Sequence, residues 1–235
     1  TEICDRVVTL RDGKSIRDVA TKDTNINEIA ESLVGREISK TTKSEARNIT
    51  TPEVFSVENL WVDMPGETVR NVSLDIKDGE ILGIGGLAGQ GKLGIPNGVM
   101  GLYEAGGSVV FKGKDIPLNS PRKCLDADIA FVSEDRRGVG LLLDESLEWN
   151  IAFPAMQVQN RFLRSYLGGL IKWRDEKAIR NITQKYIDEL AIKCTGSKQK
   201  AKELSGGNQQ KICLAKAFAL NPKFLFVSEP TRGID

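Results

Sequence analysis

A glycine-rich run at residues 85–94, GGLAGQGKLG, constrains the fold of this chain more than any other feature. The apolar stretch Glu80–Ile84 before it predicts a strand, and a helix is expected after it. The pattern G-x-x-x-x-G-K is met by Gly86, Gly89, Gly91 and Lys92. Glycines let backbone N–H groups wrap an anion, and a lysine meets the charge of the β- and γ-phosphates. The run predicts a phosphate loop, and the alternative is a plain glycine turn.

Two residues depart from a complete loop of this kind. Leu93 stands where a serine or threonine hydroxyl would bind Mg²⁺. Pro96 has no N–H to bond to the carbonyl of Lys92, so it disturbs the first turn of the helix. We therefore expect weak nucleotide binding at the candidate residues Gly86, Leu87, Ala88, Gly89, Gln90, Gly91, Lys92 and Leu93.

Strands alternate with helices along most of the chain. Val54–Leu60 and Val69–Ile76 alternate like antiparallel strands, and Asp78-Gly79 is a turn. Short apolar runs predict buried strands at Ile129–Val132 and Phe224–Val227. Helical spacing is found at Asp175–Leu190 and Gln209–Leu220. These patterns predict an α/β fold with a mainly parallel sheet.

The N-terminal residues 1–38 read as a separate small segment. Strands are expected at Asp5–Leu10 and Ser15–Ala20, joined by a turn at Asp12-Gly13. A helix is expected over Asn27–Val34, with Gly35 as its C-cap. The segment has too little apolar surface to fold alone, so it resembles the end of something larger. Residues 39–52 are polar and end in Pro52, which is typical of a linker.

Composition excludes several classes of function. The formal net charge of +1 gives no electrostatic reason to expect nucleic acid as a partner. No apolar run approaches the roughly 20 residues of a membrane-spanning helix, and the N-terminus is unlike a signal peptide. The chain has no histidine, which excludes catalysis by histidine and metal sites with histidine ligands. The scattered cysteines favour reduced thiols in a cytoplasmic protein over metal or disulfide roles; they are Cys4, Cys124, Cys194 and Cys213.

Residues 204–211, LSGGNQQK, resemble the signature of ABC (ATP-binding cassette) ATPases. A helix N-terminus of this kind suits a γ-phosphate, and the alternative is an ordinary N-cap by Ser205. The resemblance implies that the motif acts in trans, covering the nucleotide on a partner domain's phosphate loop. The nucleotide-binding candidates in it are Ser205, Gly206, Gly207, Asn208 and Gln209.

Residues 224–235 resemble the Walker B strand and D-loop of the same family. Glu229 keeps the position of the catalytic carboxylate, while Ser228 replaces the aspartate that holds Mg²⁺. Leu93 and Ser228 together remove two magnesium-holding groups, so this site is not expected to be a normal hydrolytic centre. Glu134 matches the Q-loop position, where the resemblance implies contact with nucleotide, Mg²⁺ or water. Arg136 and Arg137 after it read as a solvated turn.

The adenine platform of many relatives should lie at residues 61–64, where Met64 falls closest and Trp61 is nearby. The segment after Glu134, roughly Leu141–Met156, is unusually apolar. We expect about half of its large side chains in the core and the rest on a surface for the membrane subunit. The apolar residues concerned are Leu141, Leu142, Leu143, Trp149, Ile151 and Phe153.

The whole chain resembles the ATP-binding subunits of importers for ribose, galactose, xylose and related sugars. The stretches EICDRVVTLRDGK and LVGREI resemble the chain after the switch histidine of a first ATPase domain. Residues 1–38 are therefore expected to be the tail of that domain, 39–52 a linker, and 53–235 most of a second domain. The first phosphate loop would precede Thr1, and the second switch histidine would follow Asp235.

The resemblance implies an ATPase that uses ATP and Mg²⁺, with weak or absent binding at this domain's own site. Its implied partners are the first ATPase domain, membrane permease subunits and, indirectly, a sugar-binding protein, with no nucleic acid. Its implied location is the cytoplasmic face of the cell membrane. The isolated chain is expected to be inactive. Alternatives are a nucleoside importer ATPase, a non-transport ABC ATPase of DNA repair or translation, or a fragment that is only a nucleotide-binding or docking module.

Overall fold

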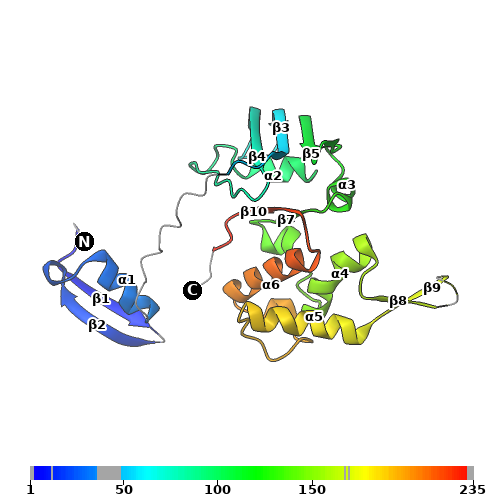
Figure 1. Cartoon of the computed structure of the whole chain (residues 1–235). Coiled ribbons are helices and arrows are strands. Elements are labelled where there is room, and N and C mark those ends of the chain that lie inside the picture. The colour runs from blue at the N-terminus through cyan, green and yellow to red at the C-terminus, as the bar shows by residue number, and fades with distance from the viewer. Residues whose placement is uncertain (1–2, 12, 36–48, 167, 169, 232–235) are drawn as a thin grey trace. The chain divides into compact units, whose positions relative to one another are not determined.

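The computed structural model describes residues 3–11, 13–35, 49–166, 168 and 170–231. It divides into two compact units, Thr1–Asn48 and Ile49–Ile234 (Figure 1). The predicted linker at 39–52 and the predicted turn residue Asp12 fall largely outside the described residues. The assignment of the first unit to the tail of another domain stays a prediction.

The first unit is a hairpin followed by a helix. Strand β1 (Arg6–Arg11) pairs antiparallel with β2 (Lys14–Ala20). A short 3₁₀ turn, η1 (Thr21–Asp23), leads to helix α1 (Ile26–Val34). Both predicted strands and the predicted helix are confirmed, as is Gly35, which ends α1 in the left-handed conformation.

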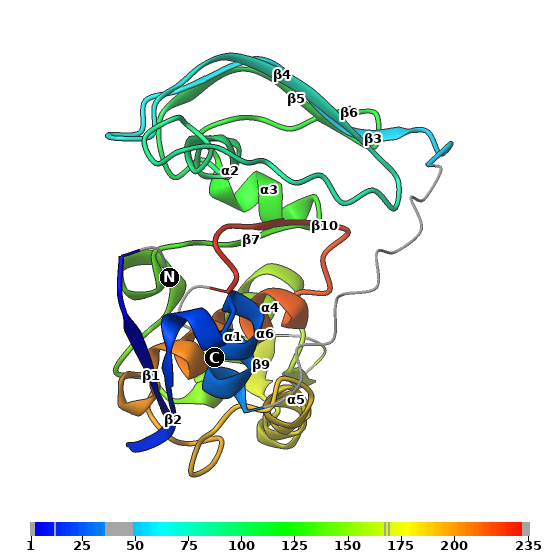
Figure 2. The same cartoon turned by 90° about the vertical axis from the view of Figure 1, so that its left-hand side faces the viewer.

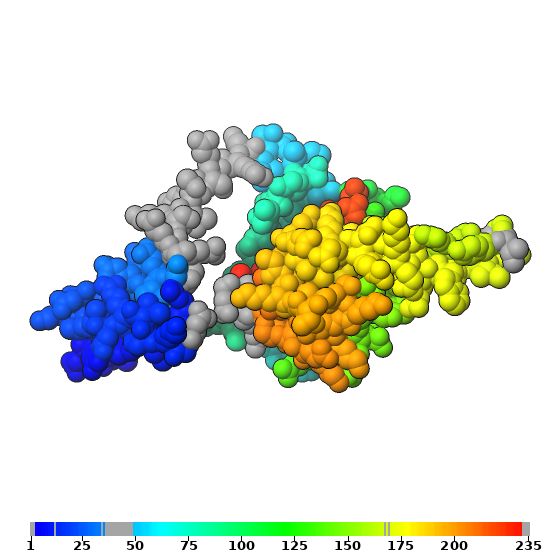
Figure 3. Space-filling model, turned by 90° about the horizontal axis from the view of Figure 1, so that it is seen from below, coloured from blue at the N-terminus to red at the C-terminus, as the bar shows by residue number. Residues whose placement is uncertain are grey.

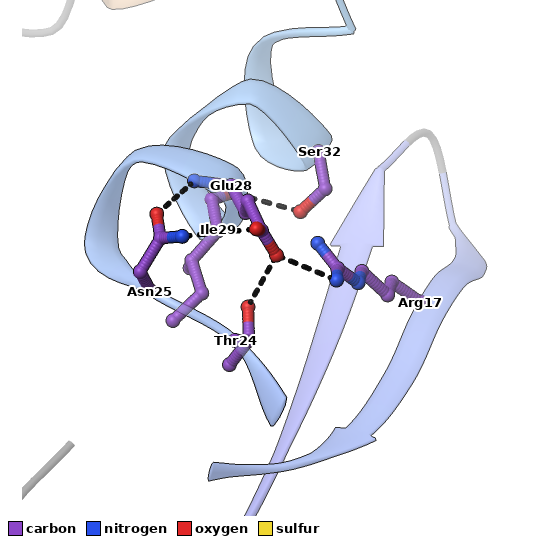
Figure 4. A network of polar contacts seen from close by, with 6 residues as sticks. All are labelled: Arg17, Thr24, Asn25, Glu28, Ile29 and Ser32. Atoms are coloured by element: carbon purple, nitrogen blue, oxygen red, sulfur yellow. Dashed lines mark hydrogen bonds and ion pairs between the residues drawn. The ribbon is translucent and has the colours of Figure 1, made fainter. Parts of the chain in front are cut away.

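The start of α1 is held by two side chains next to it in the sequence, Thr24 and Asn25, and by the more distant Arg17 (Figure 4). The Asn25 Oδ1 accepts the backbone N–H of Glu28 at 3.0 Å, and the Asn25 Nδ2 donates to Glu28 Oε1 at 2.9 Å. This is a reciprocal cap of the helix N-terminus. The Glu28 carboxylate also accepts from Thr24 and from Arg17 of β2, which ties the helix to the hairpin.

The second unit begins with an antiparallel sheet. Its strands are β3 (Glu53–Val62), β4 (Val69–Lys77), β5 (Ala105–Phe111) and β6 (Lys114–Asp115), in the order β4-β3-β5-β6. Both predicted strands of this sheet are confirmed. The fully buried helix α2 (Gly94–Val99) packs on it, and the inward side chains of β3 form its core. The core residues from β3 are Phe55, Val57, Leu60 and Val62.

A parallel pair of strands follows: β7 (Ile129–Val132) and β10 (Phe224–Val227), with Phe224 opposite Ile129. Helix α3 (Pro121–Asp126) precedes β7. These two strands were predicted. A third strand predicted at Glu80–Ile84 was wrong, because no described strand takes its backbone hydrogen bonds and Ile81 is 92% exposed. Instead, the carboxylate of Glu80 accepts the N–H of Lys77 across the predicted turn, which is confirmed.

The remaining part of the unit is helical. After η2 (Arg136–Gly140) it contains α4 (Leu147–Gln159), α5 (Glu176–Glu189), η4 (Ala201–Glu203) and α6 (Gly206–Ala219). Figures 1 and 2 show β7 and β10 lying between these helices and the antiparallel sheet. Helix α4 packs against α5 and α6. A hairpin of β8 (Leu163–Tyr166) and β9 (Ile171–Arg174) extends away from the helices (Figure 3).

The α/β class is thus confirmed, with an antiparallel β subdomain and a helical subdomain. Both predicted helices are present, although α6 begins at Gly206 instead of Gln209 because Ser205 caps it. Within the described residues, no helix is both long enough and apolar enough to span a bilayer.

Candidate functional site

The glycine-rich loop lies where the antiparallel sheet meets α2. Residues 81–90 have no regular secondary structure, and their side chains are exposed. The Lys92 Nζ donates to the carbonyl of Gly86 at 3.0 Å, so the lysine closes the loop on itself. Gly89 and Gly91 have φ angles of 82° and 84°, which favour glycine. The structure therefore shows a closed glycine loop leading into a helix, but without the strand expected before it.

A turn at residues 63–68 packs directly onto this loop. A Cβ added to Gly91 would lie 2.8 Å from the carbonyl oxygen of Thr68. A Cβ added to Gly94 would lie 2.2 Å from the carbonyl oxygen of Glu67. Glycine is required at both positions because the backbone of the turn approaches the backbone of the loop.

Glu67 is the residue of this site that sequence reasoning missed. Its side chain is only 7% exposed. Its Oε1 accepts the N–H of Gly89 at 2.7 Å, and its Oε2 accepts the N–H of Leu93 at 3.3 Å. Burial alone raises the pKa of Glu67, but the N–H groups of Gly89, Leu93 and Gly91 outweigh it and the pKa is lowered. Glu67 is therefore an ionised carboxylate held by the backbone of the glycine loop.

A hollow of about 730 Å³ lies beside the loop. Lys92 and Leu93 line it, as do Ser228 and Glu229 after β10. The predicted phosphate loop and the predicted catalytic carboxylate thus face the same space. Glu229 has a φ of 46°, an uncommon conformation outside glycine. The predicted D-loop residues 232–235 lie outside the described residues.

Glu134, the predicted Q-loop residue, is anchored to α2. The buried Asn97 donates from Nδ2 to Glu134 Oε1 at 3.2 Å and to the carbonyl of Leu93 at 2.7 Å. This joins the end of β7 to the first turn after the glycine loop.

The part of the chain that the structure describes contains no cluster of three or more acidic, cysteine or histidine side chains suited to a metal ion. The weak magnesium binding expected from Leu93 and Ser228 stays a prediction.

The signature residues form the start of α6. The Ser205 Oγ accepts the N–H of Asn208 at 3.5 Å and its Nδ2 at 2.9 Å. Gln209 is buried, and its Nε2 donates to the carbonyls of Ala201 and Leu204. Ser205 therefore does cap the helix, and the Gln209 side chain shapes the turn before it. Among the described residues that line the hollow, none comes from the signature at Ser205–Gln209.

Arg136 corrects a prediction. It was expected in a solvated turn, and the residue is partly exposed, but its Nη1 donates to the carbonyl of Gly206. At the other end of η2, the Lys216 Nζ donates to the carbonyl of Gly140, and burial lowers the pKa of Lys216. The segment after Glu134 is thus tied to α6 at two points. Arg137 is exposed, as expected.

The apolar segment Leu141–Met156 divides between core and surface. Leu141 and Ile151 are buried, and Leu142 is 48% exposed. The other three are partly buried; they are Leu143, Trp149 and Phe153. Trp149 packs edge-on against Phe153, and Arg174 lies over its ring at 5.0 Å.

The two candidates for an adenine platform lie apart from the hollow's lining. Trp61 is an exposed residue of β3 whose ring covers Gly106. Met64 is partly buried and packs against the core of the antiparallel sheet. Neither is among the described residues that line the hollow, so the platform stays a prediction.

Comparison with known proteins gives a consistent set of relatives. The family model described as ABC transporter matches residues 69–232. The ribose import ATP-binding protein RbsA of Clostridium tetani is 35% identical over 241 aligned positions, which cover 100% of this chain and 44% of that protein. RbsA of Oceanobacillus iheyensis is 36% identical over 99% of this chain and 45% of its own length. The chain thus spans less than half the length of these relatives.

Solved structures are similar in fold. A dimeric ATP-binding cassette, MJ0796, bound to ADP and phosphate matches with a TM-score of 0.58 and 23% identity, over 77% of this chain and 76% of that one. The ADP conformation of the cassette MJ1267 matches with a TM-score of 0.55 and 25% identity, over 79% and 72% of the two chains.

Proposed function

Because this chain belongs to the ABC transporter family, we propose that it is part of the ATP-binding subunit of an importer for a simple sugar. The observation that carries this proposal is the match to ribose import ATP-binding proteins over both units of the chain. Residues 1–38 are then the tail of a first ATPase domain, 39–52 a linker, and 53–235 most of a second ATPase domain. The protein hydrolyses ATP as a whole subunit, while the isolated chain does not.

The two nucleotide sites of such a subunit contribute unequally to ATP hydrolysis. In this proposal, Ser205, Gly206 and Gly207 serve the productive site in trans, on the phosphate loop of the first domain. Their position at the start of α6, away from the hollow beside Lys92, supports this arrangement. The site that contains Leu93 and Ser228 is the degraded one. Head-to-tail packing of two cassettes would combine each loop with the other domain's signature.

The implied partners follow from the same proposal. They are the first ATPase domain, the membrane permease subunits and, indirectly, a sugar-binding protein, at the cytoplasmic face of the membrane. The exposed Leu142 and the partly buried Trp149 supply apolar surface near the Q-loop for a permease helix. No nucleic acid is involved.

Sugar uptake by the complete subunit with its permease tests the proposal. Ser205→Ala is expected to abolish most uptake, whereas Lys92→Ala is expected to reduce it much less. The serine also caps α6, and losing a cap costs about 1 kcal/mol. Ser205→Asn keeps a capping side chain and is therefore the matched control for stability. If it folds normally and still loses uptake, the serine acts on nucleotide. Equal loss of uptake from Ser205→Ala and Lys92→Ala contradicts the proposed asymmetry.

A further inference from the structure

The glycine-rich loop already holds an anion that belongs to its own chain. We propose that the carboxylate of Glu67 is a built-in occupant of the phosphate position in this loop and keeps nucleotide phosphates out. The inference rests on the proposed function in one respect, that the loop at Gly86–Leu93 is a phosphate loop by descent. It adds a further cause of the site's weakness, which is separate from the disturbed first helical turn at Pro96 and from the loss of magnesium-holding groups at Leu93 and Ser228.

The contacts of Glu67 are those that a phosphate oxygen would make. Phosphate loops bind their ligand through successive backbone N–H groups. Here the N–H groups of Gly89 and Leu93 point to the two oxygens of one carboxylate, at 2.7 and 3.3 Å. Each N–H has a single hydrogen, so a bond to Glu67 competes directly with a bond to a phosphate. Lys92 is also engaged inside the loop, at the carbonyl of Gly86.

Glu67 is held in place by its own backbone as well as by its side chain. Its N–H donates to the carbonyl of Met64 at 3.0 Å, and the Thr68 Oγ1 donates to the same carbonyl at 3.3 Å. The turn lies so close to the loop that Gly91 and Gly94 have no room for a Cβ. A phosphate group therefore finds both its hydrogen-bond donors and the space beside them taken by the turn.

Charge acts in the same direction as geometry. The Glu67 side chain is 7% exposed, and a buried carboxylate that loses its partners is strongly disfavoured. A nucleotide that enters has to displace this carboxylate and bring further negative charge close to it. The apparent affinity of the loop for phosphate is reduced by the fraction of molecules in which Glu67 has moved away.

Removing the carboxylate is expected to restore anion binding. The probe is inorganic tripolyphosphate, followed by ATP, titrated into the whole 235-residue chain by calorimetry. Glu67→Ala and Glu67→Gln are each expected to bind tripolyphosphate at least about tenfold more tightly than the unmodified chain. Adding Lys92→Ala to Glu67→Ala is expected to remove the gain. Glu58→Gln removes an exposed carboxylate from β3 and is expected to change nothing.

The inference is overturned if the unmodified chain binds tripolyphosphate as tightly as folded Glu67→Ala does. It is also overturned if neither of these two proteins binds tripolyphosphate. Should both Glu67 variants fail to fold, hydrogen exchange in the unmodified chain decides. Slow exchange of the Gly89 and Leu93 amides supports the carboxylate as occupant, and exchange at the rate of an open loop overturns it. These results are independent of sugar uptake in Ser205→Ala, so the proposed function and this inference fail separately.

Discussion

At the scale of residues, a glycine just before the glycine-rich run and a glycine at the start of α2 differ sharply in what surrounds them. A Cβ at Gly94 would meet the carbonyl oxygen of Glu67 at 2.2 Å, whereas a Cβ at Gly83 would meet nothing within 4 Å. Gly94→Ala is therefore expected to lower the free energy of unfolding by about 1–3 kcal/mol, through overpacking. Gly83→Ala is expected to stay within about 0.5 kcal/mol of the unmodified chain. Urea denaturation of both variants measures the difference, and equal effects would contradict the close approach.

Sequence reasoning at this scale found residues that share a motif and missed those that act from a distance. Lys92 and Glu229 were predicted from local patterns, and the structure places both at one hollow. Glu67 lies 22 positions before Gly89, and no spacing rule connects a turn carboxylate to a glycine loop. Arg136 was missed for the same reason, since its partner Gly206 is 70 positions away.

At the scale of elements, η2 and α6 act as a connected pair. Arg136 donates to the carbonyl of Gly206, whereas the adjacent Arg137 is exposed. Arg136→Ala is therefore expected to lower the free energy of unfolding by about 1 kcal/mol, the typical value of one hydrogen bond. Arg137→Ala is the matched control and is expected to change it by less than about 0.5 kcal/mol.

Thermal and urea unfolding of the two arginine variants provide the measurement. In the complete subunit, Arg136→Ala is also expected to reduce ATPase activity, because Arg136 connects the segment after Glu134 to the signature helix. A subunit whose stability and ATPase activity are the same with either arginine replaced would show that the bond to Gly206 has no such role.

Helices with capping residues at their start were predictable from the sequence. The strand predicted at Glu80–Ile84 was wrong, because a strand also needs a neighbouring strand. Helices α5 and α6 begin at the capping residues Asp175 and Ser205, which the sequence displays. The stretch Glu80–Ile84 contains three large apolar residues, but a strand forms only when a neighbour takes its backbone hydrogen bonds. In this structure β10 bonds to β7, and no described strand bonds to Glu80–Ile84.

At the scale of the whole molecule, the proposed coupling to a permease requires exposed apolar side chains near the predicted Q-loop residue Glu134. Leu142 is 48% exposed, whereas Trp149 is packed between Phe153 and Arg174, so Leu142 is the better residue to change. Leu142→Glu in the reconstituted transporter is expected to reduce sugar uptake severalfold while ATP hydrolysis continues. Tyr166→Glu, at an equally exposed position on the β8–β9 hairpin, is the control. Normal uptake by Leu142→Glu would rule out docking at this surface.

The contact between Glu67 and the glycine loop joins two parts of one chain, which makes its occupancy a unimolecular equilibrium. The effective concentration of the carboxylate is set by the fold and is unaffected by dilution or by the supply of nucleotide in the cell. A site filled by a free ligand gains stability only as that ligand accumulates. Because a nucleotide has to displace Glu67 first, the loop of this domain is instead expected to keep the same shape over a wide range of nucleotide concentrations, so that it works as a fixed structural element.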